Sequence, residues 1–95
     1  MKKIAVIGAG YVGITTAACF ASMGHSVILA DNDQTKLDQL TKGMCPIVEE
    51  GLLDLLLLGV ESNRLFFTSS NEDAVSDADF IFLCLPTPQG EDGTA

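Results

Sequence analysis

Six residues near the N-terminus constrain the fold more than any other feature of the sequence. Residues 8–13 read Gly-Ala-Gly-Tyr-Val-Gly, a G-x-G-x-x-G spacing. Residues 3–7 before it form a short apolar run with β-branched side chains, which predicts a strand buried on both faces. Residues 11–23 are small and apolar and predict a helix, with Gly24 where a helix C-cap is expected. A glycine turn therefore joins a strand directly to a helix.

The rest of the chain alternates in the same way. We predict strands over residues 27–30, 65–68 and 80–85, and helices over residues 33–42, 51–60 and 71–76. Strands separated by helices imply a parallel sheet with right-handed crossovers. The predicted fold class is α/β, a Rossmann-type doubly wound parallel sheet, which usually has six strands in the order 3-2-1-4-5-6. Because only four are found, we expect residues 1–95 to be a truncated N-terminal part of one such domain.

Each glycine of the turn has a distinct task in a dinucleotide-binding fold. Gly8 permits the tight turn, Gly10 lets the backbone approach a pyrophosphate, and Gly13 allows the helix to pack closely on the strand. The N–H groups and the positive dipole end of the helix that begins at Tyr11 then face the phosphates. The alternative is a purely structural glycine turn.

An acidic residue follows at the end of the second predicted strand. Asp31 lies 18 positions after Gly13 (31 − 13), close to the spacing of about 20 that dinucleotide-binding chains show. Its carboxylate can accept hydrogen bonds from the ribose hydroxyls and would repel a 2′-phosphate. The sequence therefore predicts NAD, rather than NADP, as the cofactor.

Two further residues are candidates on position alone. Asp33 is expected to cap the second helix, which puts Lys36 in the first turn, where the helix dipole disfavours a cation. A ligand phosphate or ribose would explain that lysine, and an ordinary surface lysine is the alternative. Thr87 follows the fourth strand, at the mouth of the expected cofactor crevice, or is merely exposed in a Pro-rich turn. We interpret Cys84 as a small core residue, since no base for it is evident.

Composition limits the possible partners. Thirteen acidic residues against five basic ones give a net charge of −8, which argues against nucleic acid or an anionic membrane surface. No apolar run reaches the roughly 18–20 residues that span a bilayer. Three cysteines without CxxC spacing and a single histidine predict a reduced, cytoplasmic chain with no metal site.

Taken together, these residues resemble the UDP-glucose/GDP-mannose dehydrogenase family over essentially the whole chain. The resemblance rests on IAVIGAGYVG at 4–13, the Gly-His pair at 24–25, Asp31, the segments at 46–52 and 64–68, and LPTPQGEDGTA at 85–95. Val48 and Glu50 depart from the Tyr and Pro that the family often has.

The resemblance implies that the whole enzyme oxidises the C6 alcohol of a nucleotide sugar to a carboxylate in two steps, using two NAD⁺. UDP-glucose is favoured because QGEDGTA is most like that branch, while GDP-mannose and UDP-N-acetylhexosamines stay open. The family's cofactor residues map onto the turn, Asp31 and two later positions: Gly8, Gly10, Tyr11, Val12, Gly13, Asp31, Lys36 and Thr87. Its catalytic residues and its sugar-nucleotide domain lie beyond residue 95. We therefore expect no activity from this chain alone, no catalytic residue in it, and a homo-oligomer for the full-length protein.

Two other functions are compatible with the shared fingerprint. One is the NAD domain of a 3-hydroxyacyl-CoA dehydrogenase. The Tyr-Val pair in the turn and the Pro-Thr-Pro segment argue against this alternative. The other is a stand-alone NAD-binding module without catalysis.

A separate expectation concerns residues 52–58, whose six leucines cannot all face one core on a single helix. We expect part of that surface to pack on further sequence or on another subunit, unless it is an ordinary crossover helix with a partly exposed face.

Overall fold

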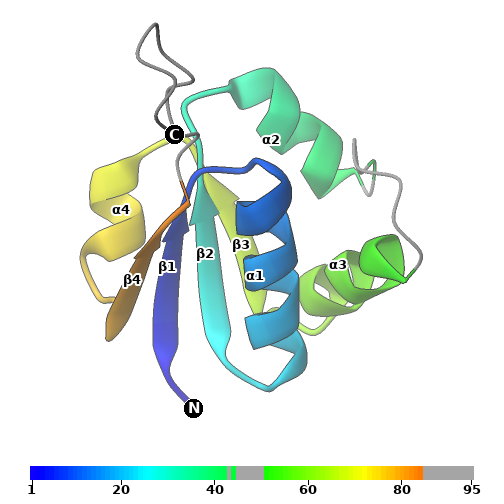
Figure 1. Cartoon of the computed structure of the whole chain (residues 1–95), viewed down its shortest axis with the longest axis horizontal. Helices are drawn as coiled ribbons and strands as arrows, with labels where there is room; N and C mark the ends of the chain where they lie inside the picture. The colour runs from blue at the N-terminus through cyan, green and yellow to red at the C-terminus, as the bar shows by residue number, and fades with distance from the viewer. Residues whose placement is uncertain (43, 45–50, 85–95) are drawn as a thin grey trace, which may run out of the picture.

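The computed structural model describes residues 1–42, 44 and 51–84, and in these ranges strands and helices alternate. The order is β1 (Lys3–Ile7), α1 (Tyr11–Ser22), β2 (Ser26–Ala30), α2 (Gln34–Thr41), α3 (Leu52–Glu61), β3 (Leu65–Thr68), α4 (Asn71–Val75) and β4 (Phe80–Leu83). The four strands form one parallel sheet in the order β3-β2-β1-β4 (Figure 1). This confirms the predicted α/β fold class.

The strand order follows from where each crossover runs. The chain passes from β1 through α1 to β2, and later through α3 to β3, with these helices on one face of the sheet (Figure 1). It then returns through α4 on the other face, so that β4 pairs with β1. Right-handed crossovers require this change of face when the direction of strand addition reverses. The reversal point lies between β1 and β4.

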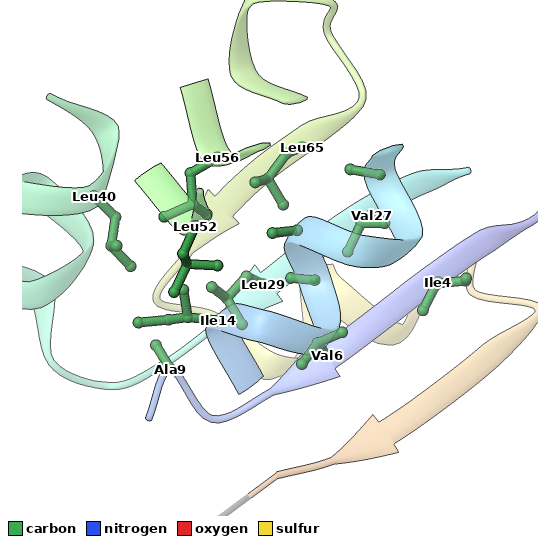
Figure 2. Packing of buried hydrophobic residues seen from close by; sticks show 13 residues of the cluster. Ile4, Val6, Ala9, Ile14, Val27, Leu29, Leu40, Leu52, Leu56 and Leu65 are labelled. Carbon is green, nitrogen blue, oxygen red and sulfur yellow. The ribbon is translucent and has the colours of Figure 1, made fainter. Parts of the chain in front are cut away.

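The main hydrophobic core fills the face covered by α1 and α3. Figure 2 shows its side chains converging from α1, α3 and the strands. The strands contribute alternate residues, among them Val6 and Leu29, and the helices contribute Ile14 and Leu56. A second, smaller cluster lies under α4 and contains Ala5, Ile7, Ala30 and Ala74. Both faces of β1 are buried, as its continuous apolar sequence predicts.

The fourth strand differs from β1, because all four of its residues are exposed. Phe80 and Phe82 share a face with Ile4 and Val6, while Ile81 and Leu83 share the other face. Phe82 packs against Phe20 of α1, with 5.1 Å between the ring centroids. In the described part of the chain β4 therefore forms an exposed edge of the sheet, and this edge is apolar on both faces.

Helix α3 carries the leucine-dense segment, and its leucines divide between two sides. Leu52 and Leu56 are buried in the main core, whereas Leu53, Leu57 and Leu58 are exposed. The expectation that these leucines cannot all face one core is confirmed. What covers the exposed leucines stays a prediction.

The element boundaries match the predicted ones to within two residues. The capping predictions are confirmed: Gly24 follows α1 with φ of 96°, and the Asp33 side chain accepts a hydrogen bond from the Lys36 N–H at the start of α2. The main difference is at β4, which ends at Leu83 where we expected residue 85. The predicted loop over residues 89–95 lies outside the described residues.

Candidate functional site

The carboxyl ends of the parallel strands meet at one edge of the sheet, where the turns from β1 to α1 and from β2 to α2 lie together. An open hollow of about 970 Å³ lies there, which we call the carboxyl-edge hollow. It is lined by residues from the ends of the strands and the starts of α1, α2 and α4: Ile7, Gly8, Gly10, Tyr11, Val12, Ala30, Asp31, Asn32, Asp33, Lys36, Asn71, Leu83 and Cys84. Open α/β sheets bind ligands at this edge, where the strand order reverses.

Two glycines of the turn are required by the protein's own packing. Gly8 has φ of 108°, a conformation that side chains rarely adopt, and its N–H donates a 2.7 Å hydrogen bond to the Ala30 carbonyl. A Cβ at Gly13 would overlap the Gly8 carbonyl oxygen and would lie 3.4 Å from the Cys84 Cβ. Both residues therefore keep α1 close against the ends of β1 and β4.

Gly10 is different, because no packing contact among the described residues requires a glycine there. Its φ of −80° and ψ of −169° suit any residue, and a Cβ would meet no heavy atom of residues 1–42, 44 and 51–84 within 4 Å. The space that a side chain would occupy opens onto the carboxyl-edge hollow. Besides the preference for glycine over most residues at a helix N-cap, the close approach of a bound group to the backbone is the physical reason for a glycine at this position.

The N-terminus of α1 is suited to a negative charge. Gly10 supplies no side-chain cap, and no acidic residue lies in the first turn of α1. By contrast, Asp33 caps α2 and Ser70 caps α4 with side-chain oxygens. The positive end of the α1 dipole thus points into the hollow without a compensating acid of its own helix, an arrangement that binds phosphate in proteins.

Asp31 stands at the end of β2, at the rim of the hollow, and its side chain is only 14% exposed. One carboxylate oxygen, Oδ2, accepts a 2.7 Å hydrogen bond from the Ala9 N–H, and Oδ1 accepts one of 2.8 Å from the Asp33 N–H. The Lys36 Nζ lies 4.0 Å from Oδ2. Lys36 thus has an ion-pair partner within the chain, in the first turn of α2 where its charge was otherwise unfavourable.

The structure brings together most of the residues that the sequence singled out. Six of them line the hollow: Gly8, Gly10, Tyr11, Val12, Asp31 and Lys36. Tyr11 and Val12 are exposed in the first turn of α1. Gly13 lies beneath the turn, against Gly8, and does not line the hollow. Thr87 lies outside the described residues.

Sequence reasoning missed other residues at the rim. Asn32, Asp33 and Asn71 line the hollow from the starts of α2 and α4. Their position directly after strand ends was the signal that could have identified them. Cys84 was interpreted as a core residue only. It contacts the main core but is half-buried and also lines the hollow, because β4 ends one residue earlier, at Leu83.

Comparison with known proteins agrees with this geometry. The sequence model of the UDP-glucose/GDP-mannose dehydrogenase family, NAD binding domain, matches residues 2–95. The chain belongs to this family. NAD is therefore the cofactor, and the hollow, with its open approach to Gly10 and uncapped helix N-terminus, fits a dinucleotide. Membership of this family decides against the alternative that the chain is the NAD domain of a 3-hydroxyacyl-CoA dehydrogenase.

Individual relatives support the same assignment. The chain is 44% identical over 93 residues to the UDP-glucose 6-dehydrogenase of Pseudomonas aeruginosa, a match covering 98% of this chain and 20% of that protein. It is 42% identical to the GDP-mannose 6-dehydrogenase of the same organism, with 96% and 21% covered. Among solved structures, the UDP-glucose dehydrogenase of Pyrobaculum islandicum superimposes with a TM-score of 0.94 at 38% identity, covering 100% of this chain and 22% of that one.

The chain spans about a fifth of the length of the curated relatives that it matches. Among the described residues, no helix is long and apolar enough to cross a membrane.

Proposed function

We propose that this chain forms the half-site that binds the adenosine and pyrophosphate of NAD in a nucleotide-sugar 6-dehydrogenase. The observation that carries the proposal is the open space over Gly10, a glycine that neither backbone strain nor packing within the described part of the chain requires. The proposed cofactor residues are those of the turn, the acid and two flanking positions: Gly8, Gly10, Tyr11, Val12, Gly13, Asp31, Lys36 and Thr87.

Each group has a chemical role in that half-site. The pyrophosphate would lie over Gly10 against the N-terminus of α1, where backbone N–H groups and the helix dipole favour anions. The ribose hydroxyls would donate to the Asp31 carboxylate, whose charge disfavours a 2′-phosphate. Lys36, 4.0 Å from that carboxylate, would contact the ribose from the α2 side.

For the whole enzyme we propose the oxidation of UDP-glucose to UDP-glucuronate. The C6 alcohol loses two hydrides, one to each of two NAD⁺, and takes up one water, which gives a carboxylate, two NADH and three protons. Relatives named as UDP-glucose 6-dehydrogenases at 42–44% identity support this substrate, together with the segment at residues 89–95. GDP-mannose is the second candidate, because a GDP-mannose 6-dehydrogenase is 42% identical.

We further propose that the 95-residue chain has no dehydrogenase activity of its own. The purified chain should produce no NADH from UDP-glucose and NAD⁺, whereas the full-length parent protein should. Turnover by the chain alone would contradict this. An open reading frame of several hundred codons past Ala95 would support the enzyme, and a stop codon there would support a stand-alone NAD-binding module.

The proposed binding function is tested by calorimetric titration of the chain with NAD⁺ and, separately, with NADP⁺. We expect NAD⁺ to bind with a clear preference over NADP⁺. Equal binding of both would contradict the role given to Asp31, and binding of neither would contradict a half-site formed by these four strands.

We also propose a cytoplasmic location and a homo-oligomeric full-length enzyme, which fractionation of cells and light scattering on the parent protein would test.

A further inference from the structure

We propose that Asp31 is a positioning residue for the glycine turn, in addition to any contact it makes with a ribose. In this structure its carboxylate already ties the β1–α1 turn to the start of α2. The glycine turn would thus be held in place by residues of the chain itself. This inference rests on the proposed function only in its consequence for phosphate binding, because the tie joins residues of this chain to one another.

The geometry of the tie is set by two backbone N–H groups on opposite sides of one side chain. The Ala9 N–H, in the glycine turn, donates to Asp31 Oδ2 at 2.7 Å across 22 positions of sequence. The Asp33 N–H, in the cap of α2, donates to Oδ1 at 2.8 Å. Both distances are typical of charge-assisted hydrogen bonds. The carboxylate is therefore held at both oxygens.

Ala9 itself is fixed from two directions. Its methyl group is buried in the main core, and only 1% of the residue is exposed. Its N–H donates to the Asp31 carboxylate. Gly8, the residue before it, is held by the hydrogen bond from its N–H to the Ala30 carbonyl. Gly10, which follows Ala9, carries no side chain that could hold it in place. The hydrogen bond from the Ala9 N–H to the Asp31 carboxylate is therefore the contact that holds the turn directly before Gly10.

The chemistry of the tie requires a carboxylate. Two N–H donors converge on one side chain, and only a carboxylate presents an acceptor oxygen to each of them. An asparagine of the same shape has one acceptor oxygen, so its NH₂ group would face one of the two N–H donors. One of the two connections would then be lost. Because each carboxylate oxygen has a second lone pair, ribose hydroxyls can still bind while the tie is kept.

The first test measures amide hydrogen exchange in the chain without any cofactor. In Asp31→Asn, exchange at Ala9 should be faster by about tenfold or more than in the wild type, relative to Val6 in the middle of β1. Asp38→Asn is the matched control, because it removes the same charge from an exposed side chain whose only partner among the described residues is Gln34. It should leave Ala9 within about twofold of the wild type. Unchanged exchange at Ala9 in Asp31→Asn would overturn the proposal.

The second test uses inorganic pyrophosphate, which has no ribose. Removal of a negative charge alone should tighten the binding of this anion, and Asp38→Asn, at a residue that does not line the hollow, gives the lower limit of that effect. If Asp31 positions the turn, Asp31→Asn should instead weaken pyrophosphate binding several-fold. Binding tightened as in Asp38→Asn would overturn the proposal. A wild-type chain that binds no pyrophosphate would contradict the proposed phosphate site, while the exchange result at Ala9 would still decide the role of Asp31.

A third measurement needs no variant, in case Asp31→Asn does not fold. A scalar coupling through the hydrogen bond, between the Ala9 nitrogen and the Asp31 carboxyl carbon, should be detectable by NMR in the wild-type chain. Its absence, with the neighbouring backbone couplings of β1 and β2 visible, would overturn the tie.

Discussion

Gly10 and Gly13 belong to one motif, yet the structure predicts opposite consequences for the same change to alanine. At Gly10 a methyl group has open space, so the chain should stay folded. Alanine reduces the freedom of the unfolded chain, a gain of about 0.4–1 kcal/mol. It is a poorer N-cap residue than glycine by a similar amount. These two effects nearly cancel, and the free energy of unfolding should change by no more than about 0.5 kcal/mol.

At Gly13 the methyl group would overlap the Gly8 carbonyl oxygen, a backbone atom that cannot move without shifting β1 or α1. Such overpacking costs about 1–3 kcal/mol, out of roughly 5–15 kcal/mol for a whole domain. For a chain of this size the melting temperature should fall by about 4–8 °C for each kcal/mol.

Gly10→Ala should be the more stable of the two variants but should have the lower affinity for NAD⁺ per folded molecule. Gly10→Ala puts a methyl group where the pyrophosphate would approach the backbone, and the loss of one charge-assisted hydrogen bond weakens binding about 10- to 100-fold. Urea unfolding and calorimetric titration of both variants measure the two quantities. The reasoning would be refuted if Gly10→Ala unfolded as easily as Gly13→Ala, or if it bound NAD⁺ as tightly as the wild type.

Three further predictions follow from single contacts. Asp31→Ala should erase the preference for NAD⁺ over NADP⁺, because the repelling carboxylate is gone while Lys36 stays at the rim. Calorimetry with both cofactors measures this preference, and its retention would contradict the role of Asp31. Asp33→Ala should lower the free energy of unfolding by about 0.5–2 kcal/mol in urea, through loss of the cap on α2. Leu56→Ala should lower the free energy of unfolding by about 2–5 kcal/mol. Leu58→Ala, at a position 56% exposed, should change it by less than about 0.5 kcal/mol. Equal losses in the two variants would show that α3 is packed differently.

Much of the fold could be predicted from the sequence because its signals are local. The apolar run of β1, the glycine turn, the Gly24 stop and the Asp33 cap each depend on backbone conformation and hydrogen bonds within a few residues. Parallel strands joined by right-handed crossovers then leave few possible sheet orders. The spacing from Gly13 to Asp31 likewise placed an acid beside the turn, because a βαβ unit has a nearly fixed length.

Other properties depended on contacts between residues far apart in the sequence, and only the tertiary structure decided them. The fingerprint predicted a separate task for each glycine, but only the fold supplies the atom against which Gly13 packs, the Gly8 carbonyl oxygen. Asp31 was expected to meet a ribose, yet in the fold it also accepts a hydrogen bond from Ala9, 22 positions away. The half-exposed Cys84 at the hollow depends on the residue at which β4 ends. Local propensity determines which residues form strands and helices, whereas the distances between their ends are set by how the layers pack.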